Sequence, residues 1–369
     1  MSTQAIQNAA RNEKKAELAE KYLVRTIEPH EWPAWDSFVS ESPSGTLFHT
    51  TRWLGTTGVP FRIYGCYHRE SLIGGMVVEI AGRHAAGHSS FTAWTNESQA
   101  SRSSQPEATG HMLNCLYLGV VLPPPSKKYV TTLTYHRNIL NSLAVHVRDQ
   151  FVTVRCYMGP EIVDMQPFIW AGYKITLVYT YRIDLSDLDM VWSNMTDKRR
   201  NDIRKAERDG ITVDNEGSIQ DILSLYKGAL RKHGRAARAS DLADDRDKIL
   251  RSHNQCRSFV ARDRSGEAVA GIYLVWDEKC AYYFMGGYGR SVAHRGAGAL
   301  AIWNAVRYAG SVLGLGKFVM LAAGDLPLER FTRDFGGHLT ATFHVRYDRP
   351  SFSRDVKRAL RRLKAIISR

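Results

Sequence analysis

The sequence lacks the signals that mark several large classes of protein. None of its segments has the roughly 18 consecutive apolar residues that a membrane-spanning helix needs. The polar and charged residues 1–20 lack the apolar stretch of a secretory signal. We therefore expect a cytoplasmic protein without a membrane span.

Cysteine is scarce, and its arrangement does not indicate a disulfide framework. The chain has five cysteines, an odd number, and no two of them form a C-x-x-C pair. Reduced, buried thiols are therefore the simpler interpretation. The residues are Cys66, Cys115, Cys156, Cys256 and Cys280.

Several catalytic motifs are also absent. The sequence contains no H-E-x-x-H, no Walker loop, no G-x-S-x-G and no Rossmann glycine fingerprint. Its histidines are scattered rather than gathered at the spacing of metal ligands. These absences argue against zinc proteases, P-loop enzymes, α/β-hydrolases and dinucleotide-binding enzymes, and we expect no metal site.

Positive charge, in contrast, is abundant and unevenly distributed. Lysine and arginine number 50 against 37 aspartate and glutamate residues, which gives a formal net charge of +13. Basic clusters favour phosphates, nucleic acid or an acidic membrane surface as partners, although a solvated surface is the alternative for each. The clusters lie in residues 198–208, 227–238 and 354–369.

Length and composition predict two domains. With 369 residues, 44% of them hydrophobic, the chain has enough apolar material for two cores. Strand and helix patterns alternate over 22–185 and again over 186–350, after a polar arm at 1–21. The second part opens with a basic linker helix over 190–209, and residues 351–369 form a basic amphipathic helix.

The two parts share one order of elements, which indicates an internal repeat. Strand–turn–strand patterns over 61–80 and 257–276 are each followed by a strand, a helix, a strand and a closing strand. Near the end of each part a glycine, Gly172 or Gly336, follows an apolar helix end. There it would adopt the left-handed conformation that ends a helix.

Four segments resemble the FemAB-like transferases and related families with doubled acetyltransferase-like (GNAT) domains. They follow the family's order and cover most of the chain from about 22 to 350. The resemblance implies an α/β (α+β) fold of two tandem GNAT-like domains, each a mixed central sheet flanked by helices. The segments are FHTTRWL (48–54), YLGVVLP (117–123), DKRRNDIRKAERDGITV (197–213) and GDLPLERFTRDFGG (324–337).

The resemblance also implies transfer of an acyl or aminoacyl group to an amine. Donors in these families are acyl-CoA or aminoacyl-tRNA, and acceptors are cell-wall precursors or amino sugars. The family often has a phosphate-binding lysine shortly after the tryptophan of its first helix. Here Leu54, Gly55, Thr56 and Thr57 follow Trp53, which argues against a nucleotide-linked murein precursor as acceptor.

Six residues are candidates for binding the acyl donor. By resemblance to GNAT folds, backbone N–H groups of a splayed strand polarise the donor carbonyl, and that strand is CAYYFMGGYGR (280–290). A simple hairpin turn is the alternative there. Glycines at the next helix start would let N–H groups approach a pyrophosphate, with helix packing as the alternative. The candidates are Met285, Gly286, Gly287, Arg295, Gly296 and Gly298.

Two residues are candidates for proton transfer. Asp325, after the strand KFVMLAAG, would act as the base or position the amine, although it could instead cap the following helix. Tyr283 would protonate the leaving group, although packing in the core is the alternative. Trp53 and Tyr117, which belong to the first two resembling segments, are candidates for contact with the acceptor.

Two basic clusters have candidate roles in binding. Arg199, Arg200 and Arg204 would clamp a substrate phosphate, with surface solubility as the alternative. Residues 352–369 carry an apolar helical stripe among cations, which suits docking to the anionic inner face of a membrane. A packed terminal helix is the alternative.

We therefore predict an N-acyltransferase. It would move an acyl group from acyl-CoA, such as acetyl-CoA, to an amine of an amino sugar or another cell-envelope precursor, small or lipid-linked and anionic. One alternative is an aminoacyl-tRNA-dependent transferase of peptidoglycan precursor synthesis. A second is a non-catalytic scaffold at the membrane surface, and donor binding separates the three.

Overall fold

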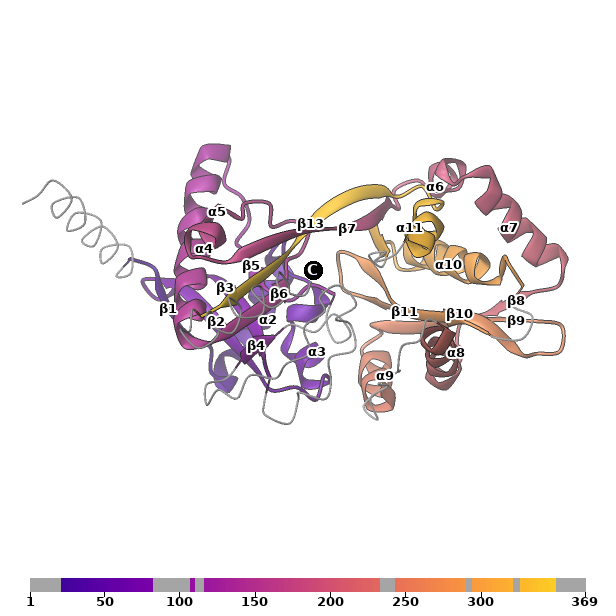
Figure 1. The fold of residues 1–369 in the computed structure, drawn as a ribbon, viewed down its shortest axis with the longest axis horizontal. Helices are drawn as coiled ribbons and strands as arrows, with labels where there is room; N and C mark the ends of the chain where they lie inside the picture. Colours follow the sequence, from indigo (N-terminus) through magenta and orange to yellow (C-terminus); the bar gives the residue numbers. More distant parts are fainter. Residues whose placement is uncertain are drawn as a thin grey trace, which may run out of the picture.

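A computed structural model shows two lobes joined by a two-stranded ribbon (Figure 1). The structure describes residues 21–81, 107–109, 116–232, 243–289, 294–320 and 326–349. The polar arm at 1–20 and the basic segment at 351–369 lie outside these ranges. None of the helices within them is long and apolar enough to cross a membrane.

The first half of the chain supplies most of one lobe. The hairpin predicted over 61–80 is β2 and β3, and the helix predicted to follow it in the repeat is α4. The elements are β1 (Leu23–Thr26), η1 (Pro29–Glu31), α2 (Trp32–Glu41), η2 (Leu47–His49), α3 (Thr51–Gly55), β2 (Phe61–His68), β3 (Ser71–Ala81), β4 (Glu107–Thr109), β5 (Val120–Val121), α4 (Tyr129–Gln150), β6 (Thr153–Tyr157), α5 (Gln166–Trp170) and β7 (Lys174–Asp184).

The second half supplies most of the other lobe. Its predicted hairpin over 257–276 is β9 and β10, and the basic linker helix is split into α6 and α7. The elements are α6 (Leu188–Asn194), α7 (Asp197–Arg208), β8 (Thr212–Asp214), α8 (Ile219–Lys232), α9 (Ala243–Ser252), β9 (Cys256–Arg262), β10 (Ala268–Trp276), β11 (Ala281–Tyr288), α10 (Ala297–Arg307), η4 (Tyr308–Val312), β12 (Lys317–Met320), α11 (Leu326–Arg333) and β13 (His338–Asp348).

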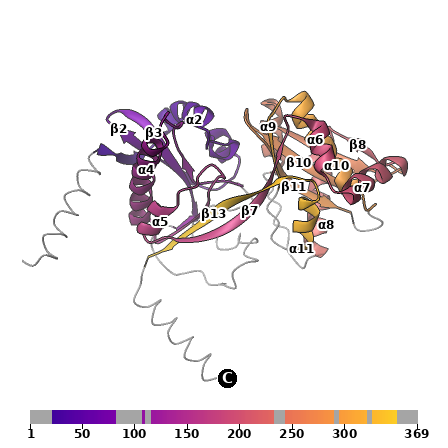
Figure 2. The same ribbon diagram turned by 90° about the horizontal axis from the view of Figure 1, so that it is seen from above.

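The strands form one continuous mixed sheet. Their order is β1-β2-β3-β4-β6-β13-β7-β12-β11-β10-β9-β8, with β5 paired to β3 beside this path. Within the described ranges, only β4 with β6 and β11 with β12 are parallel neighbours, one pair in each half. Helices cover the sheet in both lobes (Figure 2), which confirms the predicted fold class.

The two halves exchange their closing strands. β7, the last strand of the first half, pairs with β12 of the second half through Lys317↔Asp184 to Met320↔Tyr181. β13, the last strand of the chain, pairs with β6 of the first half. The two exchanged strands also pair with each other, and this ribbon joins the lobes in Figures 1 and 2.

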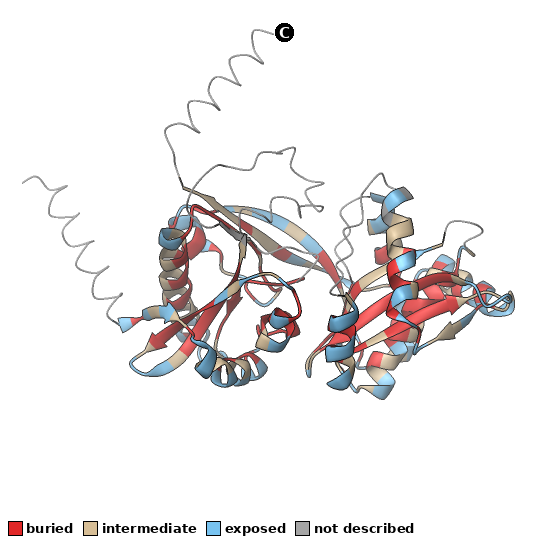
Figure 3. Cartoon of the chain, turned by 90° about the horizontal axis from the view of Figure 1, so that it is seen from below, coloured by how far each residue is buried: buried red, intermediate tan, exposed pale blue. Residues whose placement is uncertain are grey.

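The exchange makes each sheet depend on the other half. Val345 of β13 is fully buried in the core of the first lobe, together with residues of α4 such as Leu143 and Val147. Figure 3 shows buried strands at the centre of both lobes and exposed helix faces at their rims. The predicted domain boundaries, 22–185 and 186–350, follow the chain and stay a prediction, because pairing crosses between the halves.

One hydrophobic core also spans the two halves. The ring of Phe48 meets that of Tyr282 at 4.9 Å, and Trp53 meets Phe284 at 5.0 Å, both edge-on. These rings are buried in the same cluster. Buried aromatic pairs of this geometry stabilise beyond their area, so the lobes form one packed body.

Polar contacts strengthen the same interface. The ammonium of Lys279, in the β10–β11 turn, donates to the carbonyls of Val39 at 3.0 Å and Ser42 at 2.8 Å. Its neighbour Asp277 accepts from the backbone N–H of Leu47 at 2.8 Å. The turn thus caps the end of α2 and the start of η2, where backbone groups need partners.

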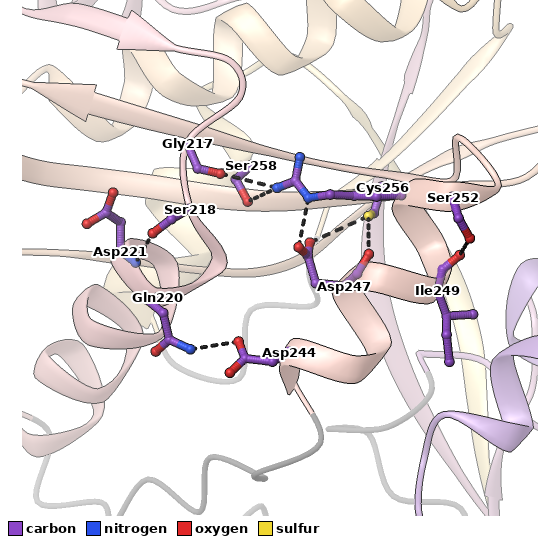
Figure 4. Close-up of polar contacts among 11 residues, drawn as sticks. Gly217, Ser218, Gln220, Asp221, Asp244, Asp247, Ile249, Ser252, Cys256 and Ser258 are labelled. Atoms are coloured by element: carbon purple, nitrogen blue, oxygen red, sulfur yellow. Dashed lines mark hydrogen bonds and ion pairs between the residues drawn. The ribbon is translucent and has the colours of Figure 1, made fainter.

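Helix α9 is anchored through charged side chains. Arg251 Nε donates to Asp247 at 2.7 Å, and its guanidinium also reaches the carbonyl of Gly217 at 3.2 Å. Figure 4 shows Asp247 facing Cys256 between the helix and β9. On the first-half side, Arg246 donates to the Thr56 hydroxyl at 3.2 Å. These buried charges are therefore paired, as stability requires.

Candidate functional site

The parallel strands β11 and β12 separate soon after they meet. They pair only at Ala281↔Phe318 and Tyr282↔Val319. The next residue of β12, Met320, pairs with Tyr181 of β7, whereas β11 continues for six residues to Tyr288. Within the described ranges, this side of β11 has no strand beside it after Tyr282, and its backbone groups need other partners.

A β-bulge lies at the same point of β11. Tyr273 of β10 pairs with Met285, but the next residue, Leu274, pairs with Tyr283, so Phe284 is the extra residue. A bulge bends its strand and redirects the side chains beyond it. Phe284 and Met285 both pack toward the core between the halves, which brings Gly286 to the face of Tyr283.

The paired glycines each allow a close approach within the protein. A Cβ on Gly286 would overlap the Tyr283 hydroxyl and lie 2.8 Å from the Gly271 carbonyl oxygen. A Cβ on Gly287 would overlap the backbone of α8 at Leu225. The close backbone approach that the sequence predicted is present, and the partners seen are protein groups.

Tyr283 lies at the separation of the strands. It packs partly buried against the core of the second lobe, and its hydroxyl lies over Gly286. Burial raises the pKa of Tyr283, so the phenol keeps its proton at neutral pH. Asp325, the candidate base, lies outside the described residues.

The start of α10 presents a cation and free backbone N–H groups. Arg295 is exposed, and its Nε lies 3.9 Å from Asp202, a long and solvated ion pair. Gly296 lies against α7, where a Cβ would overlap the Asp202 carbonyl, so helix packing explains this glycine. Gly298 is different, because the nearest atom to its Cβ position is Ala270 Cβ at 3.9 Å.

His294 shapes the approach to this helix. Its Nε2 lies 2.7 Å from Asp209, which ends α7, and its Nδ1 accepts from the N–H of Gly296 at 3.2 Å. Hydrogen bonds from Lys205 and His294 lower the pKa of Asp209 to about 2. The α10 N-terminus is therefore tied to α7, with Arg295 and Gly298 open to a ligand.

Residues of the first half reach the separation from the other side. The Thr180 hydroxyl of β7 donates to the Met320 carbonyl at 2.6 Å, where β12 leaves β11. Burial raises the pKa of Tyr117, and a hydrogen bond with Thr180 acts against this shift. Tyr117 is thus held at the junction of the two halves. Sequence reasoning missed Thr180, because only the strand exchange places it there.

The three arginines predicted as a phosphate clamp are not brought together. Arg199 is 3% exposed, and its guanidinium stacks on Phe331 at 4.2 Å and ion-pairs with Asp334 at 3.5 Å. Arg200 donates to carbonyls at the end of α6, such as that of Ser193 at 2.6 Å.

The remaining members of the predicted acceptor set also have partners inside the protein. Arg204 lies over the Trp192 ring at 5.4 Å. Trp53 is fully buried in the core between the halves, with Arg246 over its ring at 5.1 Å. The structure gives Arg199, Arg200, Arg204 and Trp53 packing or capping roles, and their contact with a substrate stays a prediction. In the described ranges, no cluster of metal-ligating side chains occurs.

Comparison with known proteins agrees with this geometry. Residues 196–330 match the model of the acetyltransferase (GNAT) domain family. The range contains both the separated strands and the start of α10. The search of curated proteins finds no significant match.

Solved structures share the whole two-lobed fold. FemX aligns with a TM-score of 0.61 at 12% identity, over 87% of this chain and 96% of FemX. The C-terminal domain of a putative lysylphosphatidylglycerol synthetase from Agrobacterium fabrum aligns with a TM-score of 0.51 at 13% identity. The alignment covers 86% of this chain and 92% of that domain. The L-PGS structure from Bacillus licheniformis aligns with a TM-score of 0.50 at 14% identity, over 89% of this chain and 95% of L-PGS.

These identities establish a common fold, and the family model identifies the domain that holds the separated strands. The expected resemblance to FemAB-like proteins is thus confirmed at the level of architecture. This chain shares the two-lobed fold of FemX, and its residues 196–330 match the acetyltransferase (GNAT) domain family.

Proposed function

We propose that the chain transfers an acyl group from acyl-CoA to an amine, with the donor at the separation of β11 and β12. The observation that carries this proposal is the loss of pairing after Tyr282↔Val319 beside a bulge at Phe284. Exposed strand N–H groups there would polarise a thioester carbonyl. Arg295 and the N–H groups near Gly298 would hold the donor's phosphates.

The reaction needs a C–N bond to form as the C–S bond breaks. Acyl-CoA, when bound, supplies the thioester as the activated acyl group. The attacking amine must lose a proton, and Asp325 is our candidate to accept it. Tyr283, whose phenol stays protonated, would donate a proton to the departing sulfur. Its hydroxyl over Gly286 lies at the same separation of the strands.

The acceptor is proposed to be an amino sugar or another anionic precursor of the cell envelope. The similar structures include FemX and the C-terminal domain of a putative lysylphosphatidylglycerol synthetase. The basic charge of the chain supports an anionic acceptor. Peripheral contact with an anionic membrane through residues 352–369 belongs to the same proposal.

Calorimetric titration of acetyl-CoA tests the donor. We expect micromolar binding that falls about tenfold in Arg295→Ala, since one charge-assisted phosphate contact is lost. Arg52→Ala, an exposed arginine of α3, is the matched control and should bind normally. Tyr283→Phe should retain binding but lose turnover. Binding that is equal in Arg295→Ala and wild type would contradict the proposed phosphate site.

Aminoacyl-tRNA is the alternative donor, because the shared fold includes FemX and lysylphosphatidylglycerol synthetases. If acetyl-CoA does not bind and charged tRNA does, the donor assignment is wrong while the transfer class stands. Measuring both titrations on one preparation separates these outcomes.

A further inference from the structure

The exchanged strand β13 brings two arginines face to face. In the β13–β6 register, Arg346 lies directly opposite Arg155. In the β13–β7 register, Arg346 also lies opposite Lys174. Side chains of directly opposed residues share one face of a sheet, about 5 Å apart at their Cβ atoms. Three cationic side chains therefore form one row across β6, β13 and β7, which we call the cationic row.

The face that carries the row follows from the buried residues. Val154, Cys156 and Val345 alternate with the row and are buried in the first-lobe core with α4. Successive residues of a strand point to opposite faces. The cationic row thus lies on the face away from α4 and α5. Thr180, which contacts Met320, shares this face, because it lies six positions, an even number, after Lys174.

Among the described residues, Arg155 makes no hydrogen bond or ion pair, and its electrostatic attraction to the carboxylate of Asp348 is shared with Arg346. The Nε of Arg155 is itself buried. Asp348, on the same face, forms an ion pair with Arg346, with its carboxylate oxygen 2.7 Å from the Arg346 Nε. Glu79, fully buried on β3, lies two strands from Arg155.

Like charges directly opposite each other destabilise a sheet. A half-buried guanidinium also needs hydrogen-bond acceptors to offset its lost hydration. Asp348 offsets part of the repulsion between the two arginines, but the Arg155 Nε has no acceptor among the described residues. An anion with several acceptor oxygens would meet both needs, since guanidinium groups bind phosphate oxygens in pairs.

Uncharged residues lie next to the cationic row on the same face of the sheet. His344 stacks on Tyr157 with ring centroids 4.5 Å apart, and Thr176 lies opposite His344 on β7. Burial and the nearby Arg155 and Arg346 lower the pKa of His344 to about 4. The imidazole is therefore neutral at pH 7 and can donate one hydrogen bond beside the cationic row.

We propose that Arg155, Arg346 and Lys174 form a binding site for a phosphate-type anion, completed in the first lobe by the last strand of the chain. Resting on the proposed function, we assign this anion to the acceptor. Six residues of β7, about 20 Å at roughly 3.3 Å per residue, separate Lys174 from Thr180 at the strand separation. The acceptor's phosphate and its amine would then be far apart.

Thermal melting in inorganic phosphate or pyrophosphate, at constant ionic strength against chloride, tests the site. We expect both anions to raise Tm of the wild type and to bind Arg155→Gln about tenfold or more weakly. Arg62→Gln, an exposed arginine on β2, is the control and should respond as the wild type does. Without anion, Arg155→Gln should melt no lower than the wild type, because it removes a like-charge contact.

The ring protons of His344 give a readout that stability alone would not move. In wild-type protein, the pKa of His344 should rise when pyrophosphate is added, because the anion offsets Arg155 and Arg346. His344→Gln assigns the signal. No shift in the wild type, or an equal gain in Tm for wild type and Arg155→Gln, would overturn the proposal.

The source of the phosphate is distinguished with vesicles. If phosphatidylglycerol vesicles sediment the wild type but much less of Arg155→Gln, phosphatidylcholine vesicles sediment neither, and pyrophosphate releases the wild type, the anion is a lipid headgroup. If pyrophosphate stabilises the protein but neither vesicle binds, the anion belongs to a soluble acceptor. All these assays omit acyl-CoA, so their failure leaves the donor site untouched, and failure of the donor titration leaves the cationic row untouched.

Discussion

Each half of the chain contains one parallel pair of strands, and the two pairs differ in what lines them. In the second half Tyr282 pairs with Val319, and in the first half Thr109 pairs with Arg155. On the far side, Val319 pairs with Arg182 and Arg155 pairs with Arg346. Val319 is thus equivalent to Arg155, and Arg346 to Arg182, because the residue numbers in each equivalent pair differ by 164.

The equivalent positions therefore have different chemistry. Val319 is a buried apolar residue, and Arg182 ion-pairs with Glu161 at 2.9 Å. Arg155 lies beside Arg346, and its buried Nε has no hydrogen-bond partner among the described residues. The helices that lead into β12 and β6 also begin differently. Arg295 and Gly296 precede α10, whereas three prolines at 123–125 precede α4. Under our proposals, one scaffold would bind the donor in one half and an anion in the other.

The largest effect should come from removing β13. A chain that ends at Gly337 should lose the fold of both lobes, because β13 completes the first-lobe sheet and buries Val345 there. Circular dichroism and amide exchange of β6 would measure this. A chain that ends at Arg349 is the control and should stay folded. Retained protection of β6 in the shorter chain would show that the first half is independent.

Trp53→Ala should destabilise both halves together by about 3–5 kcal/mol, the usual cost of removing a buried large aromatic. The ring packs on Phe284 of the second half and is fully buried. Denaturant unfolding followed by two probes, one in each lobe, measures the effect. Trp170→Ala, which changes a ring that is 64% exposed, should leave the midpoint nearly unchanged. Separate transitions for the lobes would contradict one packed body.

Acid should destabilise the protein through a histidine buried beside the core that joins the halves. Burial, with a smaller effect from Lys279, lowers the pKa of His49 to about 3. The unfolded state binds the proton near pH 6.5, so this contribution is present above that pH and is lost as pH falls toward 3. Between pH 7 and pH 5 we expect a loss of about 2 kcal/mol.

Urea unfolding at both pH values measures this loss, and His49→Gln should show a smaller one. His49 is buried next to Leu47 and Phe48 of the core that joins the halves, and its Nδ1 accepts from the Thr46 N–H at 3.2 Å. An unchanged pH dependence in the variant would assign the acid response to other groups, such as His344.

The smallest expected change separates a ligand role from packing. Gly298→Ala meets no atom closer than 3.9 Å, so stability should be unchanged. If phosphates approach this backbone, acetyl-CoA binding should weaken about tenfold. Gly316→Ala, at an open position of the same half, is the control. Equal binding by both variants would locate the donor's phosphates elsewhere.

Local patterns predicted the elements well, because they depend on neighbours in the chain. The hairpins β2–β3 and β9–β10 follow from apolar strands around polar turns. Gly172 and Gly336, with φ of 88° and 76°, end their helices in the left-handed conformation that the sequence indicated. The splayed strand was also located, through its family resemblance and paired glycines.

Long-range pairing was not predictable in the same way. Nothing in the pattern of β13 indicates that it pairs with β6, 187 residues away at Tyr157↔His344. Without that pairing, Arg155 and Arg346 are two isolated cations of unremarkable strands. The burial of Arg199 was unpredictable for the same reason, because its partners Phe331 and Asp334 come from the far end of the domain.

The strand exchange also governs the order in which the protein can be made. During synthesis, the first lobe must wait for β13, and 187 residues at about 5–20 per second take about 10–40 s. Through that interval β6 carries an unpaired edge, the kind that recruits other chains. The rate of translation through the second half, rather than the stability of the folded protein, would then determine how much of the chain aggregates during synthesis.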